Sequence, residues 1–395
     1  MKNKKNKALI SIFLVLILLL SACGQKTDEK PKEENTKVEE KKVEEIKRDE
    51  TTGLEIFSED EMKFAKSLKI TRLQDGYILV DMAGGEDVVL LVPKDKEKLD
   101  VADFTQVFYP AENIGAYSTT HVALINAIGH LDKVGSVNMK VDNWHIDEVK
   151  KAMEDGKIAF VGNSFDLDYE MVQSVSPEMV ITSGAKTEKA EKSKTKLQEL
   201  GIPTFGVYQH IENDPRGRIE WVKFFGILVG DEETANKYFD DQIARIAKIE
   251  EENKSLDPKP TIVNFRAGED GITVKREEDY SVRMLEMAGG TYGLAGMVEK
   301  GTGTYKISPE EFYKSAEKVD ILIHENMGKR VDSIENLLAF GDYLVDLKAV
   351  QDEKVYTTNA NYWQKMDKTA EMIEELNLII KGEAPDKMEF YKRIK

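Results

Sequence analysis

The stretch from Pro215 to Leu256 constrains the fold of this chain more than any other part of the sequence. Its apolar residues recur at alternating intervals of three and four, which is the spacing of an amphipathic helix. Gly230 interrupts the pattern, and Asp231 can restart it because a capping aspartate accepts hydrogen bonds from free backbone amides. Pro258 and Pro260 close it. We therefore predict one long helical segment over residues 215–256, with room for a kink and a folded block on each side.

Short apolar runs alternate with helical stretches on both sides of this segment. Such alternation is typical of α/β proteins with parallel sheets. Residues 61–92 differ, because their apolar runs and turn signals predict two or three antiparallel strands. We therefore predict an α/β fold in which two Rossmann-like lobes with parallel sheets are joined by one long interlobe helix. The strands expected in the lobes lie at 107–109, 158–161, 179–182, 204–207, 261–265, 272–274, 321–323 and 355–356.

Residues 1–23 have the composition of a secretion signal. Four lysines precede an apolar run, Ala8–Leu20, which is shorter than the roughly 20 residues that span a bilayer. Leu20–Cys23 is similar to the bacterial lipobox, whose cysteine is diacylated and becomes the mature N-terminus. We expect lipidation of Cys23 to hold the protein on the extracytoplasmic face of the cell membrane. An ordinary signal peptide with an incidental cysteine is the alternative.

The residues that follow the signal are too polar to form a core. Residues 24–50 are almost wholly charged or small and polar, with no aromatic side chain. Such a segment cannot bury enough apolar surface to offset its ordering entropy, so we expect a disordered tether over residues 24–60. The first lobe is then assigned to residues 61–214, the interlobe helix to 215–256 and the second lobe to 257–395.

Charge and cysteine content exclude several classes of function. The formal net charge of −17 argues against a nucleic-acid partner, because binding phosphates requires a basic face. A single cysteine excludes an intrachain disulfide and a cysteine-rich metal site. The histidines show no tight metal-ligand spacing, so we expect no metal site and no cofactor, although convergence in the fold stays open. The histidines are His121, His130, His145, His210 and His324.

Three phrases in the sequence resemble a known family. They are Tyr169-Glu170 with Ser176–Ile181, Pro215–Trp221 at the start of the long segment, and Ile307–Glu311 ahead of Val319–Ile323. Together with the lipobox they resemble the substrate-binding lipoproteins of ABC transporters that handle iron–siderophore complexes, haem and cobalamin. The resemblance covers residues 61–395. It implies two lobes on one rigid helix, a ligand captured in the cleft between them, delivery to a permease with its ATPase, and no enzymatic activity.

The resemblance also implies two docking residues. In that family one acidic residue on each lobe contacts arginine pockets of the permease. Glu170 falls at this position in the first lobe and Glu310 in the second, where Glu311 stays open as an alternative. Two separated carboxylates can fix the register of a large polar interface.

A ligand in the cleft would contact loops at the ends of the strands. Aromatic side chains and arginines in these loops suit a bulky, flat and partly anionic ligand. We expect an iron chelate of the siderophore type, with haem or a corrinoid as the alternative. The loops of the first lobe include 117–119, 143–145, 163–165, 183–185 and 208–210. The candidate ligand-binding residues are Trp144, Tyr208, Arg266, Arg283, Tyr305 and Trp363.

Three other functions remain as alternatives. A receptor for a free divalent metal ion would use the same fold. An exported enzyme would use the cleft for catalysis, but no nucleophile–base motif or metalloprotease helix occurs in the sequence. A surface adhesin would need neither permease nor ATPase.

Overall fold

The computed structural model describes residues 47–101, 104–163, 166–268, 271–327 and 330–395. The predicted signal peptide, Cys23 and most of the tether lie outside these ranges. Residues 46–395 form one compact unit. No helix in the described ranges has the length and apolar character needed to cross a bilayer.

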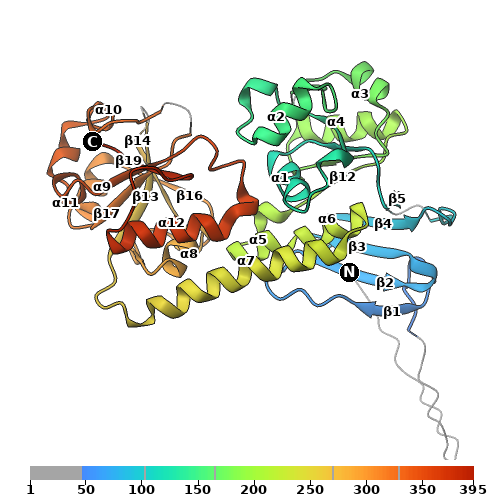
Figure 1. The fold of residues 1–395 in the computed structure, drawn as a ribbon, viewed down its shortest axis with the longest axis horizontal. Coiled ribbons are helices and arrows are strands. Elements are labelled where there is room, and N and C mark those ends of the chain that lie inside the picture. The colour runs from blue at the N-terminus through green and yellow to red at the C-terminus, as the bar shows by residue number, and fades with distance from the viewer. Residues whose placement is uncertain (1–46, 102–103, 164–165, 269–270, 328–329) are drawn as a thin grey trace, which may run out of the picture. The chain divides into compact units, whose positions relative to one another are not determined.

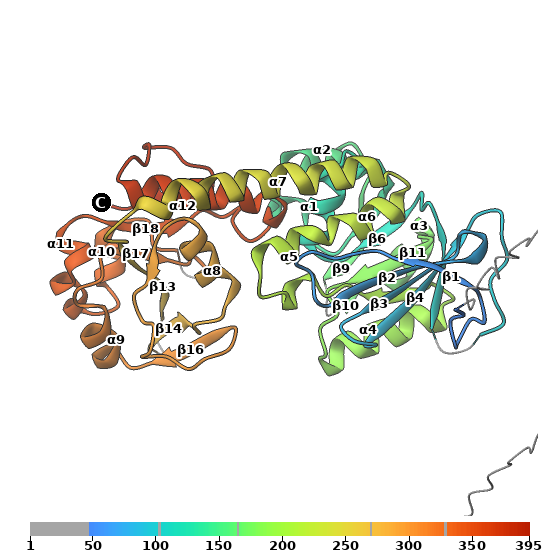
Figure 2. The same cartoon turned by 90° about the horizontal axis from the view of Figure 1, so that it is seen from below.

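The first sheet is built from five strands in the order β1-β2-β3-β4-β5. Figure 2 shows β1 to β4 side by side. Strands β1 to β4 pair antiparallel, as expected for residues 61–92, whereas β5 pairs parallel with β4. The strand expected at 107–109 therefore belongs to this sheet and not to the lobe's parallel sheet. The strands are β1 Ile56–Glu59, β2 Leu68–Leu73, β3 Ile78–Met82, β4 Asp87–Pro93 and β5 Thr105–Tyr109.

The predicted boundary between tether and folded chain at residue 60 is wrong. Strand β1 lies before it, and Arg48 and Glu55 form a β-bridge. Leu54 and Ile56 pack against a small apolar cluster that contains Leu90. Isolated apolar residues in a charged segment thus suffice for order when a neighbouring strand offers both backbone partners and an apolar face.

The second sheet is wholly parallel, with the order β12-β11-β6-β7-β8. Its strands alternate with helices, as predicted for the first lobe, and the carboxyl ends of its strands share one edge. The strands are β6 Ile114–Ala116, β7 Val134–Val137, β8 Ala159–Phe160, β11 Met179–Thr182 and β12 Thr204–Gly206, and a short hairpin joins β9 Gly162–Asn163 to β10 Asp166–Leu167. The helices are α1 Thr119–Ala127, α2 Asp147–Glu154, α3 Tyr169–Val175 and α4 Glu188–Glu199.

The third sheet, in the second lobe, has a parallel centre and antiparallel edges. Strands β13, β17 and β18 pair parallel, whereas β14, β16 and β19 pair antiparallel. The strands are β13 Thr261–Gly268, β14 Gly271–Lys275, β15 Thr291–Tyr292, β16 Thr304–Ile307, β17 Ile321–His324, β18 Val355–Thr358 and β19 Tyr391–Arg393. The helices are α8 Tyr280–Met287, α9 Pro309–Ala316, α10 Ile334–Leu338, α11 Lys348–Gln351 and α12 Thr369–Lys381.

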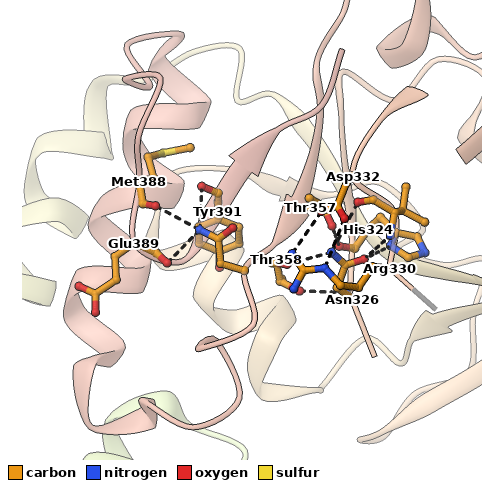
Figure 3. A network of polar contacts seen from close by, with 11 residues as sticks. His324, Asn326, Arg330, Asp332, Thr357, Thr358, Met388, Glu389 and Tyr391 are labelled. Atoms are coloured by element: carbon orange, nitrogen blue, oxygen red, sulfur yellow. Dashed lines mark hydrogen bonds and ion pairs between the residues drawn. The ribbon is translucent and has the colours of Figure 1, made fainter. Parts of the chain in front are cut away.

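Side-chain amides tie the loops of this lobe to its strands. The backbone N–H of Asn326, which follows β17, donates to Thr358 Oγ1 at 2.9 Å, and its side-chain amide donates to the Thr358 carbonyl at 3.2 Å (Figure 3). The Thr357 hydroxyl donates to the carbonyl of His324 at 3.1 Å. These contacts hold the carboxyl ends of β17 and β18 together.

The long segment predicted over residues 215–256 is divided into α5 Pro215–Glu220, α6 Val222–Val229 and α7 Glu232–Glu252. Gly230 adopts the left-handed conformation with φ 80°, which ends α6. A Cβ atom added to Gly226 would lie 2.4 Å from the Cβ of Ala235, so α6 and α7 pack closely instead of forming one rod. The continuous helix is therefore confined to α7.

Helices α6 and α7 have different surroundings. In α6, Phe224, Phe225 and Leu228 are fully buried, and the Leu228 carbonyl accepts a hydrogen bond from the N–H of Ala111. Helix α6 is thus part of the first lobe. Helix α7 lies beside α12 in both views (Figures 1 and 2), and Arg245 pairs there with Glu371 and Glu374.

The restart at Asp231 yields a stability prediction. The carboxylate of Asp231 accepts from the N–H of Thr234 at 3.1 Å and lies 3.0 Å from His130 Nε2. These contacts lower the pKa of Asp231 to about 2, with the His130 hydrogen bond as the main cause. We expect Asp231→Ala to lower the free energy of unfolding by about 1 kcal/mol in urea titrations at pH 7, because the helix cap is lost. Asp231→Ser, which retains a capping oxygen, should recover most of that loss; equal losses would contradict the capping role.

Candidate functional site

A cavity of about 200 Å³ lies at the carboxyl edge of the parallel sheet in the first lobe. Strand ends of α/β sheets are where ligands of such proteins bind. The first lobe supplies most of the lining, and the second lobe adds one residue from the turn before α12. The lining residues are Ser118, Thr120, Leu124, Ser183, Gln209, His210, Arg218 and Met366.

Arg218 of α5 is the charged residue of this cavity. Its Nε donates to the Glu212 carbonyl at 2.9 Å and its Nη2 to the His210 carbonyl at 2.5 Å. Its guanidinium lies 3.4 Å above the ring of Tyr280, on α8 of the second lobe. Within the described chain no carboxylate lies close enough to form an ion pair with it, and burial lowers its pKa. A half-buried cation without an ion-pair partner favours an anionic ligand.

Gln209 is held in one orientation beside Arg218. Its Nε2 donates to Thr120 Oγ1 at 2.5 Å, and its Oε1 lies 3.3 Å from His121 Nε2. Burial lowers the pKa of His121 to about 3, so this ring is neutral at physiological pH and donates to Gln209. His210 remains exposed at the cavity and stacks on Tyr208 with ring centroids 6.3 Å apart.

Of the six candidate ligand residues, Tyr208 is the one that directly adjoins a lining residue, Gln209, in the chain. Its hydroxyl is turned away, however, and donates to Asp87 Oδ2 of β4 at 2.7 Å. Burial raises its pKa, so the phenol stays protonated. Tyr208 therefore supports the wall that carries Gln209 and His210.

Trp144 is packed into the core. Its side chain is 1% exposed, and its indole N–H donates to the Met139 carbonyl at 3.2 Å. Its neighbours do reach the second lobe, since the N–H of His145 and the carbonyl of Asn143 each bond the Gln364 amide at 2.7 Å. The expected ligand contact by Trp144 is thus not supported, because an aromatic side chain in a predicted loop can equally be buried.

The other four candidates do not line the cavity. Arg266 has its Nη1 3.3 Å from Met327 Sδ. Tyr305 lies on β16, where a loop was expected, with Arg276 over its ring at 5.6 Å. Trp363 is half-buried, with its ring 5.0 Å from Tyr362. Arg283 lines a different cavity.

The residues that do line the cavity were only partly visible in the sequence. Ser118, Ser183, Gln209 and His210 fall in the loops named above, but none of them was selected, because their side chains carry no distinctive motif. Arg218 lies in the phrase Pro215–Trp221, close behind the 208–210 loop. This proximity to a predicted ligand-binding loop was the sequence feature that could have identified Arg218 as a candidate.

Histidines do not converge on a metal site. Among the described residues no group of three or more His, Cys, Asp or Glu side chains is placed to hold an ion. His324 is buried, with its Nδ1 3.2 Å from Asn326 Oδ1 (Figure 3) and its Nε2 accepting from the N–H of Ala267 at 3.3 Å. Burial lowers its pKa to about 4, so it is neutral at physiological pH.

Asp367, next to Met366, yields a pH-dependent prediction. It is 7% exposed, its Oδ1 has no partner in the described chain, and burial raises its pKa to about 7 despite nearby Lys365 and Lys368. The pKa of this carboxyl group in the folded protein exceeds the value of about 4 expected for the unfolded chain. The contribution of Asp367 to stability is therefore greatest below about pH 4 and is lost as the pH rises through about 7. We expect Asp367→Asn to raise the free energy of unfolding by about 2 kcal/mol at pH 8 and by less at pH 5 in urea titrations.

The exposed Asp240→Asn is the control for this experiment and should change stability little at either pH. An equal gain from Asp367→Asn at both pH values would contradict the assignment, because the effect would then not follow the titration of the carboxyl group.

The chain is similar in sequence to known proteins. Residues 114–362, well over half of the chain, match the periplasmic binding protein family. An uncharacterised lipoprotein of Methanocaldococcus jannaschii is 28% identical over 297 residues, which cover 73% of this chain and 69% of the relative. Strands β1 to β5 precede the matched residues.

Solved structures share the fold at low identity. A periplasmic haem-binding protein of Pseudomonas aeruginosa has a TM-score of 0.56 at 14% identity, covering 72% of this chain and 98% of that protein. A possible iron-binding periplasmic solute-binding protein of Staphylococcus epidermidis has a TM-score of 0.55 at 17% identity, covering 68% and 98%. The predicted fold class of two α/β lobes joined by a long helix is thereby confirmed. This chain belongs to the periplasmic binding protein family.

Proposed function

We propose that this protein is an extracytoplasmic solute-binding lipoprotein, anchored through Cys23, that captures an anionic iron chelate of the siderophore type. It delivers the chelate to an ABC permease with its ATPase and catalyses no reaction itself. The named lipoproteins among its relatives support the anchor, and the family supports solute binding.

Arg218 is the observation that carries this proposal. Its guanidinium lines the cavity and lacks a carboxylate partner among the described residues, while hydrogen bonds from Nε and Nη2 fix its orientation. A carboxylate or catecholate oxygen of a chelate would supply the missing charge. The cavity of about 200 Å³ is smaller than typical ligand pockets of roughly 300–1,000 Å³, so it would take the anionic edge of a larger ligand.

Haem is the second candidate, because His210 lines the same cavity with an exposed imidazole. A haem could place a propionate on Arg218 and its iron near His210. Partial desolvation of the ring at the cavity and the nearby Arg218 lower the pKa of His210, which favours the neutral ring that a metal requires.

A thermal-shift screen tests the function. Ligands that bind only the folded state raise the melting temperature. The panel contains ferric catecholates, ferric hydroxamates, haem, a corrinoid and free divalent cations. We expect a ferric catecholate to give the largest rise. If only haem raises the melting temperature, and His210→Ala abolishes the accompanying Soret shift, the ligand is haem. A response to free cations alone would contradict both the chelate and the haem proposals.

Glu170 and Glu310 are proposed to dock the permease. Each is the second residue of its helix, in α3 and α9, and each carboxylate is exposed and unpaired within the described chain. Glu311 is engaged in its own helix, where it accepts from the Ser308 N–H at 2.8 Å and from its hydroxyl at 2.9 Å. This difference favours Glu310 as the second docking residue.

We expect Glu170→Lys and Glu310→Lys to reduce uptake of the chelate by cells at least about tenfold, because each reversal places like charges across the interface. Ligand binding by the purified variants should be unchanged. Glu233→Lys, at an exposed first-turn position of α7, is the matched control and should leave uptake intact. Normal uptake by both docking variants would refute their role.

A further inference from the structure

A second and larger cavity is lined by the residues that follow His210 in the same loop. Its volume is about 510 Å³. It is bounded by segment 62–67, which leads into β2, by loop 211–214 and by Arg283 of α8. The first cavity takes Gln209 and His210 from the same loop, so the two cavities share one wall.

The basic residues of this second cavity have no acidic partners. Lys63, Lys66 and Arg283 are exposed, and within the described chain none of their side chains forms an ion pair or hydrogen bond. The chain as a whole has a formal charge of −17, whereas this cavity gathers three cations that no acidic side chain of the described residues pairs with. A bound anion would give these side chains the charge partner that they lack.

The acidic residues of the same cavity are already engaged. The Glu212 carboxylate accepts from the backbone N–H groups of Lys66 and Ser67 at 3.0 and 2.9 Å and from Trp221 Nε1 at 3.2 Å. Asp214 pairs with Arg216 at 2.8 Å. Arg216 balances the charge of Asp214, and neither acid pairs with Lys63, Lys66 or Arg283. The three cations therefore outnumber the one remaining negative charge of the lining, that of Glu212.

The backbone beneath the lysines is held in place. The N–H of Lys63 donates to Glu220 Oε1 at 2.9 Å, and the N–H of Lys66 donates to Glu212. Both carboxylates are buried. Because the two lysines project from an anchored segment, binding an anion orders only their side chains, which keeps the entropic cost low.

We propose that this cavity binds a small polyanion with phosphate or carboxylate groups, held by Lys63, Lys66 and Arg283. The volume suits a molecule with several charged groups, and the unpaired amide of Asn213 in the lining adds hydrogen-bond donors. The site does not use Arg218, so it stands independently of the chelate assigned to the first cavity.

Calorimetric titration of the purified protein tests the proposal, with citrate and pyrophosphate as probes and acetate as a monovalent comparison at low salt. We expect a polyanion to bind and acetate not to bind. The variant Lys63→Gln/Lys66→Gln/Arg283→Gln should bind the polyanion at least about tenfold more weakly, because it removes all three charge partners of the anion. Added sodium chloride should weaken binding.

Two control variants separate this site from others. Lys237→Gln/Lys318→Gln removes exposed lysines elsewhere and should leave polyanion binding unchanged. Arg218→Gln removes the cation of the proposed chelate site and should weaken polyanion binding less than the triple variant does. Absence of polyanion binding to the wild type would overturn the proposal. So would equal weakening in the control lysine variant, or a loss caused by Arg218→Gln and not by the triple variant.

Discussion

Arg218→Gln is expected to weaken binding of an anionic chelate by about 30-fold or more. Truncating one partner of a desolvated, hydrogen-bonded charge pair costs about 2–5 kcal/mol, and 1.4 kcal/mol corresponds to a factor of ten. The native guanidinium is oriented by the carbonyls of His210 and Glu212 and by the face of Tyr280, so a ligand meets it already in place. Calorimetric titration of wild type and variant with the chelate identified by thermal shift measures the effect.

Two further variants show whether charge or geometry matters. Arg218→Lys keeps the charge but loses the planar fork, so binding should be intermediate. Arg216→Gln changes another arginine of α5, whose charge is already offset by Asp214 at 2.8 Å, and should leave chelate binding intact. Equal affinities of wild type and Arg218→Gln would exclude Arg218 as the anion-binding residue.

Glu220→Ala is expected to lower the free energy of unfolding by about 3–5 kcal/mol. The side chain is fully buried and accepts from the N–H groups of Lys63, Phe64 and Ala65 at 2.9, 2.7 and 2.9 Å. It also pairs with Lys223 at 2.8 Å. Its removal leaves several donors and a cation unsatisfied, and the loss of one member of a buried charged network carries a cost of this size.

Urea titration monitored by circular dichroism measures this loss. Glu233→Ala removes an exposed acid of α7 and should change stability by less than about 0.5 kcal/mol. A loss below about 1 kcal/mol for Glu220→Ala would show that solvent or other groups replace the carboxylate. The expected large loss implies that segment 62–67, and with it the sheet of β1 to β5, is an integral part of the first lobe.

Local patterns predicted most of the secondary structure. The alternation of apolar runs placed β11, β12, β13, β17 and β18, because buried strands of parallel sheets are short and continuously apolar. The restart of the helix at Asp231 was also predictable, since an aspartate that follows a helix-ending glycine can cap the next helix. Helix α6 was harder to separate from α7, because the same apolar spacing occurs in a buried helix and in an amphipathic one.

Contacts between distant residues could not be predicted. The hydrogen bond from the Tyr208 hydroxyl to Asp87 joins residues that lie 121 positions apart in the sequence. Because of this bond the phenol supports the wall of the cavity. Trp144 was expected at the ligand for its residue type, whereas its burial depends on how the 143–145 loop folds onto the lobe. Arg218 gains its significance from the absence of an ion-pair partner among the described residues, which no local motif encodes.

The central claim is that the Arg218 cavity receives the charged edge of an anionic metal chelate. The most direct measurement is calorimetric titration of the wild-type protein with an anionic ferric tris-catecholate and with a neutral ferric tris-hydroxamate of similar size. We predict tight binding of the catecholate, weaker binding of the hydroxamate, and loss of the difference in Arg218→Gln. Equal affinity of the wild type for both chelates, or a preference for the neutral one, would contradict the account.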